Sequence, residues 1–415
     1  MKVLYIVYWG AAEPLGQSLV LPAVSKLADL GAELTLVTFE KPQDLARGDE
    51  MGRIRDSLDK RGVKWIPLRY HKQPKVPATV FDIINGAARG ILARLKMRPD
   101  IIHARTFIGG MIGMAIAPIL RSKLIYHNEG FYPDEQVDAG VWKMNSAPHR
   151  VAKRLEEKMY SRADGIIAMS NRGKMCIEDL AEVRRKGAPV IVVPSCVDLD
   201  HFRYSRSKFP VDGEPLRLVY SGSVGGRYHL DHLARFVAVA ADSTGPTELR
   251  VLTRSDHTLA ESLLRDGGLD KSHWSIESLA YSQMPGELAK QHAGLHFLPK
   301  GISEHGGSPT KIGEYWAAGL PVVVTPNAGD TDEIIRSERV GVIVDSHSDD
   351  SYRRAAVELV SLLKDSELPR RCRGAAETHY ALESACHRQY SLYNDLVLRN
   401  SNLRAGTGAS ELSKL

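Results

Sequence analysis

The stretch SPTKIGEYWAAG at 308–319, followed directly by LPVVVT at 320–325, predicts a short helix that leads into a buried strand. Ser308 is a favoured N-cap, and Pro309 fits the first helical position, where its missing N–H group costs nothing. Gly319 supplies a left-handed stop. The opening turn should therefore present unpaired backbone N–H groups and the positive end of the helix dipole, which favour a phosphate or a carboxylate.

Lys311 is the unusual residue of this helix. A capping box would place Glu or Gln there, and the dipole disfavours a cation by about 0.3 kcal/mol, so we expect a negative group to compensate. Glu314 lies three residues further on the same face, where it could accept hydrogen bonds from hydroxyl groups of a phosphate-bearing ligand. An exposed ion pair between Lys311 and Glu314 is the alternative, and these residues alone leave it open.

The length and the rhythm of apolar runs predict two domains. At 415 residues and 43% hydrophobic content the chain exceeds one ordinary core. Short apolar runs alternate with helical stretches, which is typical of parallel strands joined by crossover helices in an α/β fold. We predict an N-terminal domain at 1–195, a second domain at 196–375, a closing helix at 376–399 and a disordered tail at 400–415.

Charge is distributed unevenly between the two halves. Residues 1–190 hold 30 Lys and Arg against 21 Asp and Glu, whereas the remainder holds 25 against 29, which together give the net +5. Arg89, Arg94, Lys96 and Arg98 lie on or just after a predicted amphipathic helix. Such a patch suits an anionic membrane surface, and a solvated face is the alternative. Nucleic acid is disfavoured because no aromatic-interleaved basic motif is present.

Cysteine use and hydropathy indicate the compartment. The four cysteines show no close-spaced metal pattern and are too few for a disulfide framework. No signal-peptide region precedes the first strand, and no apolar stretch reaches the roughly 18 residues of a membrane span. We therefore expect a cytoplasmic protein without a bound metal, which makes at most peripheral contact with the inner face of the cell membrane.

The first strand, at 2–8, is followed by the loop WGAAEPLGQS. The spacing G-x-G-x-x-G is absent, which argues against NAD or FAD, and we expect no cofactor. Gly16 in this loop could let the backbone approach a ligand, although a glycine required only by the turn is the alternative.

Several segments carry a resemblance to a known family, and they occur in the family's order: LEEKMYSRADGIIAMS at 155–170, VIVVPSCVDLDHF at 190–202, and SPTKIGEYWAAGLPVVVTP followed by NAGDTDEII. Together they resemble the retaining GT-B glycosyltransferases of family 4, group 1. The resemblance implies two Rossmann-like, doubly wound domains that face each other across a cleft. The family's E-x7-E signature is half present, since Glu314 matches the second Glu, Gly306 stands at the first, and Glu304 is out of register.

The resemblance assigns the donor, a nucleoside-diphosphate sugar, to the second domain. It implies that Glu314 binds the ribose hydroxyls and that the backbone of Ser308, Pro309 and Thr310 approaches the sugar or the diphosphate. One cation that the family uses at the diphosphate is missing from this chain, and Lys311 is the candidate that replaces it.

The loop SGSVGGRYHLD corresponds to the family's glycine-rich loop, which supplies an Arg and a Lys to the diphosphate. Gly222 and Ser223 open it; Ser223 stands where the Arg is expected, and Arg227 lies close to the Lys position. The resemblance places the nucleobase near Leu279 and Ala280.

The resemblance also implies the catalytic residues of the first domain. His127, in KLIYHNEG, matches a His that approaches the donor sugar, and Glu129 and Arg105 lie at neighbouring strand ends. His127 is expected to orient a sugar hydroxyl or to assist acceptor deprotonation, since imidazole suits proton transfer near neutral pH. Arg105 and Gly16 are the expected acceptor-binding residues.

The function predicted from the sequence is metal-independent, retaining transfer of a sugar from a nucleoside diphosphate to an acceptor. The expected acceptor is a saccharide or lipid-linked saccharide of envelope polysaccharide or lipopolysaccharide assembly. A sugar-nucleotide epimerase of the same architecture and a non-catalytic nucleotide-sugar-binding subunit remain alternatives.

Overall fold

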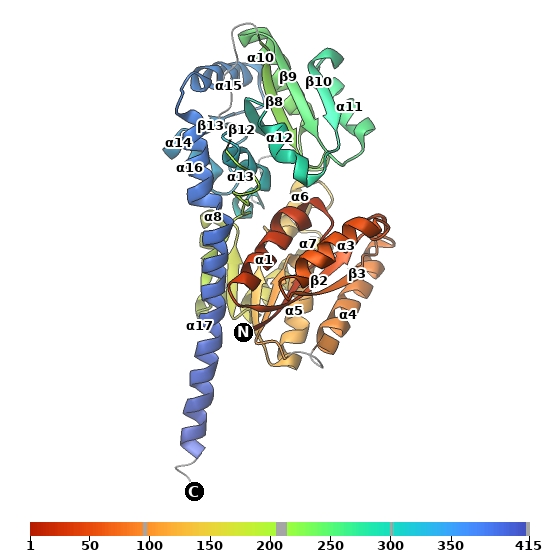
Figure 1. Ribbon diagram of the computed structural model, residues 1–415, viewed down its shortest axis with the longest axis vertical. Coiled ribbons are helices and arrows are strands. Elements are labelled where there is room, and N and C mark those ends of the chain that lie inside the picture. The colour runs from red at the N-terminus through yellow and green to blue at the C-terminus, as the bar shows by residue number, and fades with distance from the viewer. Residues whose placement is uncertain (94–97, 205–213, 299–300, 302, 412–415) are drawn as a thin grey trace. The chain divides into compact units, whose positions relative to one another are not determined.

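The computed structural model describes residues 1–93, 98–204, 214–298, 301 and 303–411 (Figure 1). The chain divides into two α/β units, each built on one sheet. The N-terminal unit comprises Met1–Glu129, Arg150–Val193 and Leu382–Leu415, and the C-terminal unit comprises Gly130–His149 and Pro194–Ala381.

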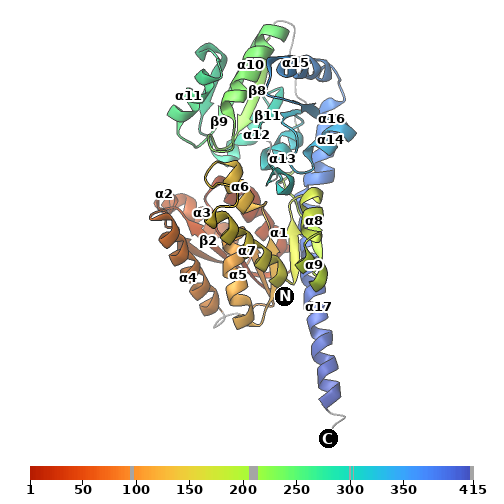
Figure 2. The same ribbon diagram turned by 180° about the vertical axis from the view of Figure 1, so that it is seen from behind.

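The N-terminal unit contains a seven-stranded parallel sheet in the order β3-β2-β1-β4-β5-β6-β7. Its strands are β1 (Lys2–Val7), β2 (Glu33–Glu40), β3 (Lys64–Arg69), β4 (Ile101–Arg105), β5 (Lys123–His127), β6 (Gly165–Ala168) and β7 (Val190–Val192). The order reverses direction at β1, as in a doubly wound sheet, and the carboxyl ends of β1 and β4 then flank the usual ligand position. Buried β-branched and aromatic residues fill these strands, because helices cover both faces (Figures 1 and 2).

The helices of this unit are the π-helical turn η1 (Gly16–Val20), α1 (Leu21–Asp29), α2 (Pro42–Leu45), α3 (Gly48–Asp59), α4 (Lys75–Ala93), α5 (Phe107–Leu120), α7 (Ala147–Arg162), which begins three residues before the unit resumes, α8 (Asn171–Glu178), α9 (Ala181–Lys186) and α17 (Leu382–Glu411).

The C-terminal unit contains a six-stranded parallel sheet in the order β10-β9-β8-β11-β12-β13. Its strands are β8 (Leu216–Ser221), β9 (Thr247–Leu252), β10 (Trp274–Glu277), β11 (Ala293–His296), β12 (Val322–Val324) and β13 (Gly341–Ile343). Its helices are α6 (Tyr132–Asp138), α10 (Leu230–Thr244), α11 (His257–Asp266), η2 (Lys271–His273), η3 (Tyr281–Gln283), α12 (Met284–Leu288), η4 (Ser303–Gly306), α13 (Thr310–Ala317), α14 (Thr331–Glu338), α15 (Asp349–Leu363), α16 (Leu368–Ala375) and the π-helical turn η5 (Ala376–Tyr380).

The end of the chain differs from the prediction in two ways. The expected closing helix at 376–399 is divided, because the chain re-enters the N-terminal unit at Leu382 and α17 packs there through side chains such as Leu392 and Leu396. Residues 400–411, where the sequence predicts a disordered tail, have a helical backbone as part of α17. A helix that is already nucleated extends at little cost, so a polar composition alone did not end it. Residues 412–415 lie outside the described chain.

The segment 130–149 also differs from the prediction. It belongs to the C-terminal unit, although it lies within the range predicted for the first domain. It carries α6, which packs against η4. Composition gave no signal of this exchange, since the segment follows β5 as an ordinary connection would.

Among the described residues, no helix is both long and apolar enough to cross a membrane. Two members of the basic patch, Arg94 and Lys96, lie outside the described residues.

Candidate functional site

The start of α13 is held by the turn that enters the C-terminal unit. Pro309, rather than Ser308, occupies the N-cap position. The Ser308 hydroxyl accepts a hydrogen bond from the Ser195 N–H at 3.1 Å, and the Ser195 hydroxyl donates to the Ser308 carbonyl at 2.5 Å. The predicted Ser308 cap is therefore wrong, because this hydroxyl is engaged outside the helix. Gly319 ends the helix with a φ of 85°, as predicted.

Lys311 is buried in the first turn of α13, with 9% of its surface exposed. Its ammonium lies 4.9 and 4.7 Å from the ring centres of Tyr220 and Tyr228, and its Nζ lies 3.5 Å from Nδ1 of His296. Burial lowers the pKa of Lys311 to about 7, although the charge of Glu314 opposes this shift. The alternative of an exposed ion pair is therefore wrong, and the site contains a cation that is costly to bury.

The glycine-rich loop after β8 lies against this lysine. Gly222 adopts a φ of 137°, and a Cβ there would lie 3.0 Å from Lys311 Nζ, so a larger residue would displace the ammonium. The next residue, Ser223, is exposed, and its carbonyl accepts a hydrogen bond from the Tyr220 hydroxyl. The structure thus brings Gly222 and Lys311 together, as the sequence predicted.

Glu314 lies one turn further along α13 and is also buried. Burial raises the pKa of its carboxyl to about 7, and the charge of Lys311 opposes the shift. In the loop after β10, burial and the charge of Glu314 raise the pKa of Tyr281, which stacks on His201 with ring centres 4.6 Å apart.

Leu279 and Ala280 precede this tyrosine. Leu279 is half-buried against the core, and Ala280 is exposed and donates its N–H to Gln283 at 3.1 Å. Tyr281, which follows them, has the flat apolar face that a nucleobase stacks on, and the sequence prediction did not include it.

Arg227 is not the free guanidinium that the sequence suggested. It pairs with Glu135 at 3.2 Å and with Glu304 at 2.8 Å. Burial opposes the charged form, yet these two carboxylates keep the pKa of Arg227 above its usual value. Because α6 supplies Glu135 from residues far away in the sequence, no local motif indicated this pair. A diphosphate at Arg227 would have to compete with both carboxylates.

Glu304 and Gly306 show why the family signature is only half present. Glu304 is 1% exposed, and burial raises the pKa of its carboxyl to about 7 despite the nearby Arg227. A Cβ at Gly306 would lie 3.0 Å from the ring of Phe131. A glutamate at position 306 would therefore collide with the segment 130–149, and the acidic side chain at Glu304 instead faces Arg227.

In the N-terminal unit, a chain of buried hydrogen bonds ends at His127. Gln389 Nε2 donates to the Tyr393 hydroxyl at 2.7 Å, and this hydroxyl lies 2.7 Å from Nδ1 of His103. His103 Nε2 lies 3.1 Å from Nδ1 of His127. Burial lowers the pKa of both histidines well below the usual value, so both rings are neutral near pH 7.

This chain determines which nitrogen of His127 carries the proton. Among the described residues, only the His103 ring can accept the Tyr393 O–H, so His103 must carry its proton on Nε2 and donate to His127. His127 therefore carries its own proton on Nε2. Within the described part of the chain that buried atom has no hydrogen-bond partner, and Glu129 Oε1 is 3.9 Å away. The arrangement suits a donor to a ligand oxygen better than the general base that was one of the two expected roles.

Arg105 and Glu129 form an ion pair beside this histidine, and Arg105 also donates to the Tyr5 hydroxyl at 3.4 Å. The guanidinium is 4% exposed and lies 5.7 Å from the ring centre of Trp9. Both residues are thus largely engaged with protein groups.

Gly16 is required by its own loop. A Cβ there would lie 2.0 Å from the Gly10 carbonyl oxygen, which is far inside contact distance. This close approach explains the glycine without a ligand, in agreement with the turn alternative.

The chain resembles known proteins in sequence and in fold. Residues 19–201 match the model of Glycosyltransferase Family 4. This match covers less than half of the chain. No curated protein sequence matches the chain.

Solved structures extend the likeness to the whole chain. Sucrose-phosphate synthase from Thermosynechococcus elongatus superposes with a TM-score of 0.67 at 14% identity, over 96% of this chain and 100% of that chain. Anabaena HepE in complex with UDP superposes with a TM-score of 0.67 at 13% identity, over 95% of this chain and 100% of that chain. WaaG, a glycosyltransferase involved in lipopolysaccharide biosynthesis, superposes with a TM-score of 0.62 at 15% identity, over 94% of this chain and 99% of that chain. The chain therefore has the two-domain GT-B fold, and the resemblance of its motifs to Glycosyltransferase Family 4 is confirmed.

Proposed function

We propose that the chain is a glycosyltransferase that moves a sugar from a nucleoside-diphosphate sugar to a saccharide or a lipid-linked saccharide. The donor is assigned to the C-terminal unit and the acceptor to the N-terminal unit. The transfer proceeds with retention and without a metal at the diphosphate, as the family resemblance implies.

The observation that carries the proposal is the buried ammonium of Lys311 in the first turn of α13. A buried cation without a full counter-charge costs several kcal/mol, and the lowered pKa of Lys311 reflects that cost. A diphosphate would supply the missing charge and would also meet the N–H groups of the helix start. A related fold supports this assignment, since Anabaena HepE was solved with UDP and with UDP-glucose.

The same groups supply the chemistry of the leaving group. Departure of a nucleoside diphosphate leaves negative charge on the phosphate oxygens while the sugar becomes oxocarbenium-like. A preorganised ammonium and a helix start stabilise that charge without reorganising water. Electrostatic stabilisation of this kind is usually the largest contribution to lowering the activation free energy. Glu314, one turn away, accepts hydrogen bonds from the ribose hydroxyls.

His127 is assigned to hold a sugar hydroxyl. Its Nε2–H is buried and has no acceptor in the part of the chain that the structure describes, which costs about 1–3 kcal/mol until a ligand oxygen supplies one. We therefore give His127 the role of hydrogen-bond donor, and the neighbouring Glu129 the role of a second polar contact.

The outer face of α4 supports a lipid-linked acceptor. Val76, Val80, Phe81, Ile84 and Leu92 are exposed along one stripe of this helix, with Val76 at 74% and Ile84 at 63%. Lys72, Lys75 and Arg89 flank the stripe and are exposed as well. Apolar side chains with adjacent cations are typical of a helix that lies on an anionic membrane surface. We propose this contact at the inner face of the cell membrane, where a cytoplasmic enzyme would meet such an acceptor.

Incubation with a panel of labelled nucleotide sugars tests the activity. Transfer to a saccharide, or slow hydrolysis of the donor, would support the proposal. An isomerised donor would indicate an epimerase, and binding without turnover would indicate a non-catalytic subunit. Glu314→Ala should weaken UDP binding about 10- to 100-fold, since hydrogen bonds to a charged group contribute about 1.5–3 kcal/mol. Unchanged UDP affinity would contradict the ribose assignment.

Sedimentation with anionic liposomes tests the membrane contact. The double variant Phe81→Asp and Ile84→Asp should remain in the supernatant, whereas Met175→Asp, at an exposed apolar position on α8, should sediment like the wild type. Equal sedimentation of all three would overturn the contact at α4.

A further inference from the structure

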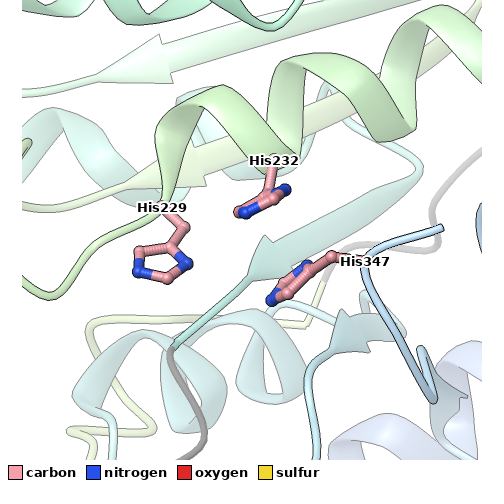
Figure 3. Close-up of side chains that lie close together, drawn as sticks. All are labelled: His229, His232 and His347. Atoms are coloured by element: carbon pink, nitrogen blue, oxygen red, sulfur yellow. The ribbon is translucent and has the colours of Figure 1, made fainter. Parts of the chain in front are cut away.

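Three histidines of the C-terminal unit gather outside the donor site. His229 and His232 lie at the start of α10, and His347 lies in the loop after β13 (Figure 3). One ring nitrogen from each lies within 4.8 Å of the other two. All three side chains are half-buried, so an ion from solvent can reach them. We call these three residues the histidine cluster.

A buried tyrosine orients two of the rings. The Tyr352 hydroxyl lies 3.2 Å from Nδ1 of His232 and 3.0 Å from Nδ1 of His347. The phenol oxygen can accept from one Nδ1–H group while its own O–H donates to the other Nδ1, so the hydroxyl holds both rings. Metal-binding histidines are usually held in this way, by a second group on the nitrogen that does not bind the metal.

His229 completes the set from the other side. Its Nδ1 is buried and lacks a hydrogen-bond partner among the residues that the structure describes. Its ring centre lies 5.3 Å from that of His232 and 5.8 Å from that of His347. Figure 3 shows the three rings facing a common space. Asp231, on the same helical turn, adds a negative charge that acts on His229 and favours a cation nearby.

We propose that His229, His232 and His347 form a binding site for a divalent transition-metal ion. Neutral imidazole suits zinc, copper and nickel, whereas calcium and magnesium require oxygen ligands. Three histidines leave a fourth tetrahedral position for water. Zinc is the ion that we assign, because it tolerates this geometry without redox chemistry.

Metal binding would rearrange the rings. His232 and His347 are stacked, with centres 3.9 Å apart and an angle of 15° between the planes. Zinc–nitrogen bonds of about 2.0–2.1 Å require ligand nitrogens about 3.3 Å apart. The two rings would therefore turn out of the stack, while the Tyr352 hydroxyl stays hydrogen-bonded to Nδ1 of each ring.

The site would join two segments that are far apart in the sequence. His229 lies near the end of the glycine-rich loop that carries Gly222 and Arg227, and His347 precedes α15. A bound ion would fix the end of the glycine-rich loop to the β13–α15 loop. The proposed metal site depends only on the positions of the histidine cluster and Tyr352, and it does not depend on the proposed sugar transfer.

Titration of metal-free protein, from which any affinity tag has been removed, tests the site. Isothermal titration with zinc chloride should give one site per chain, and cobalt chloride should give the visible absorption of a tetrahedral complex. His347→Ala should weaken zinc binding at least tenfold, and Tyr352→Phe should weaken it about 10- to 100-fold, as loss of an orienting partner does. His387→Ala, at an exposed histidine on α17, should bind like the wild type.

Two results would overturn the site. Wild-type protein that binds no zinc would show a histidine stack held only by packing. Equal affinity in His347→Ala and His387→Ala would place any bound zinc elsewhere. Far-ultraviolet circular dichroism checks that His347→Ala is folded, and His232→Gln, which is closer in shape, repeats the test if it is not.

Discussion

At the scale of single residues, the structure makes Tyr393 a positioning residue for His127. It holds His103, which in turn holds His127 with its proton on Nε2. Tyr393→Phe should release this constraint, so that His127 populates both neutral tautomers and transfer falls about tenfold, the loss of one modest hydrogen bond. Long-range ¹H–¹⁵N spectra of the imidazoles report the tautomer directly.

Tyr390→Phe, on the same helix, is the control and should leave both tautomer and rate unchanged. Wild-type His127 with its proton on Nδ1 would contradict the hydrogen-bond chain.

The sequence identified the charged residues of the site better than their surroundings. Lys311 stood out because a lysine is misplaced at a helix start, and Glu314 followed from helical spacing. Burial was not predictable, since it depends on Tyr220 and Tyr228, whose rings lie near Lys311 only in the folded unit. The charge of Arg227 acts on Lys311 in the folded unit, but the two carboxylate partners of Arg227 were not predicted, because one of them comes from α6.

At the scale of elements, α6 limits the charge available at the donor site. Its Glu135 competes with any phosphate for Arg227, and Asp138 and Glu304 add further negative charge nearby. Glu135→Gln should therefore raise the affinity for UDP about fivefold, since removal of one charge a few ångströms away is worth about 1 kcal/mol.

Isothermal titration measures this affinity, with Glu261→Gln on the surface of α11 as the control. Weaker binding in Glu135→Gln would show that the glutamate instead holds Arg227 in place for the ligand.

Helix α17 contributes to the core of the N-terminal unit rather than closing the second one. Leu396 is 3% exposed and lies close to Gly165 in β6, whereas Leu398 is 62% exposed on the same helix. Leu396→Ala should lower the free energy of unfolding by about 2–4 kcal/mol, while Leu398→Ala should change it by less than about 0.5 kcal/mol. Urea unfolding followed by circular dichroism makes the comparison, and equal midpoints would contradict this packing.

The element pattern was predictable where local signals agree. The helix stop at Gly319 and the parallel strands follow from turn chemistry and apolar runs. The packing of α17 in the N-terminal unit and the membership of 130–149 in the C-terminal unit were not predictable. Both depend on contacts between distant segments, which local periodicity does not encode.

At the scale of the whole molecule, Glu304, Glu314 and Lys311 are three of the buried groups through which stability depends on pH. The lowered pKa of the buried His103 and His127 acts in the opposite direction to the glutamates, because stability gained from these neutral rings rises with pH up to about their usual pKa of 6.5. Burial raises the pKa of Glu304 and of Glu314 from 4.5 to about 7, so between these values the folded state holds more protons and stability falls as pH rises. Burial lowers the pKa of Lys311 from 10.5 to about 7, so above pH 7 the unfolded state holds more protons and stability rises with pH.

The combined contribution of Glu304, Glu314 and Lys311 should therefore be smallest near pH 7. Each group changes the free energy of unfolding by at most about 1.4 kcal/mol per pH unit. Urea unfolding between pH 5.5 and 8.5 should show the wild type losing stability relative to Glu314→Gln as the pH rises to about 7, because only the wild type carries the buried carboxyl. A difference between the two proteins that stays constant from pH 5.5 to 7 would contradict the assigned direction.

The central claim is that a nucleoside diphosphate compensates the buried charge of Lys311, and Lys311→Met tests it most directly. Methionine keeps much of the volume but removes the charge, so thermal unfolding should occur at the same or a higher temperature. UDP or GDP affinity, measured by isothermal titration on the same samples, should fall about 100-fold. Undiminished affinity of Lys311→Met for both nucleotides would contradict the account.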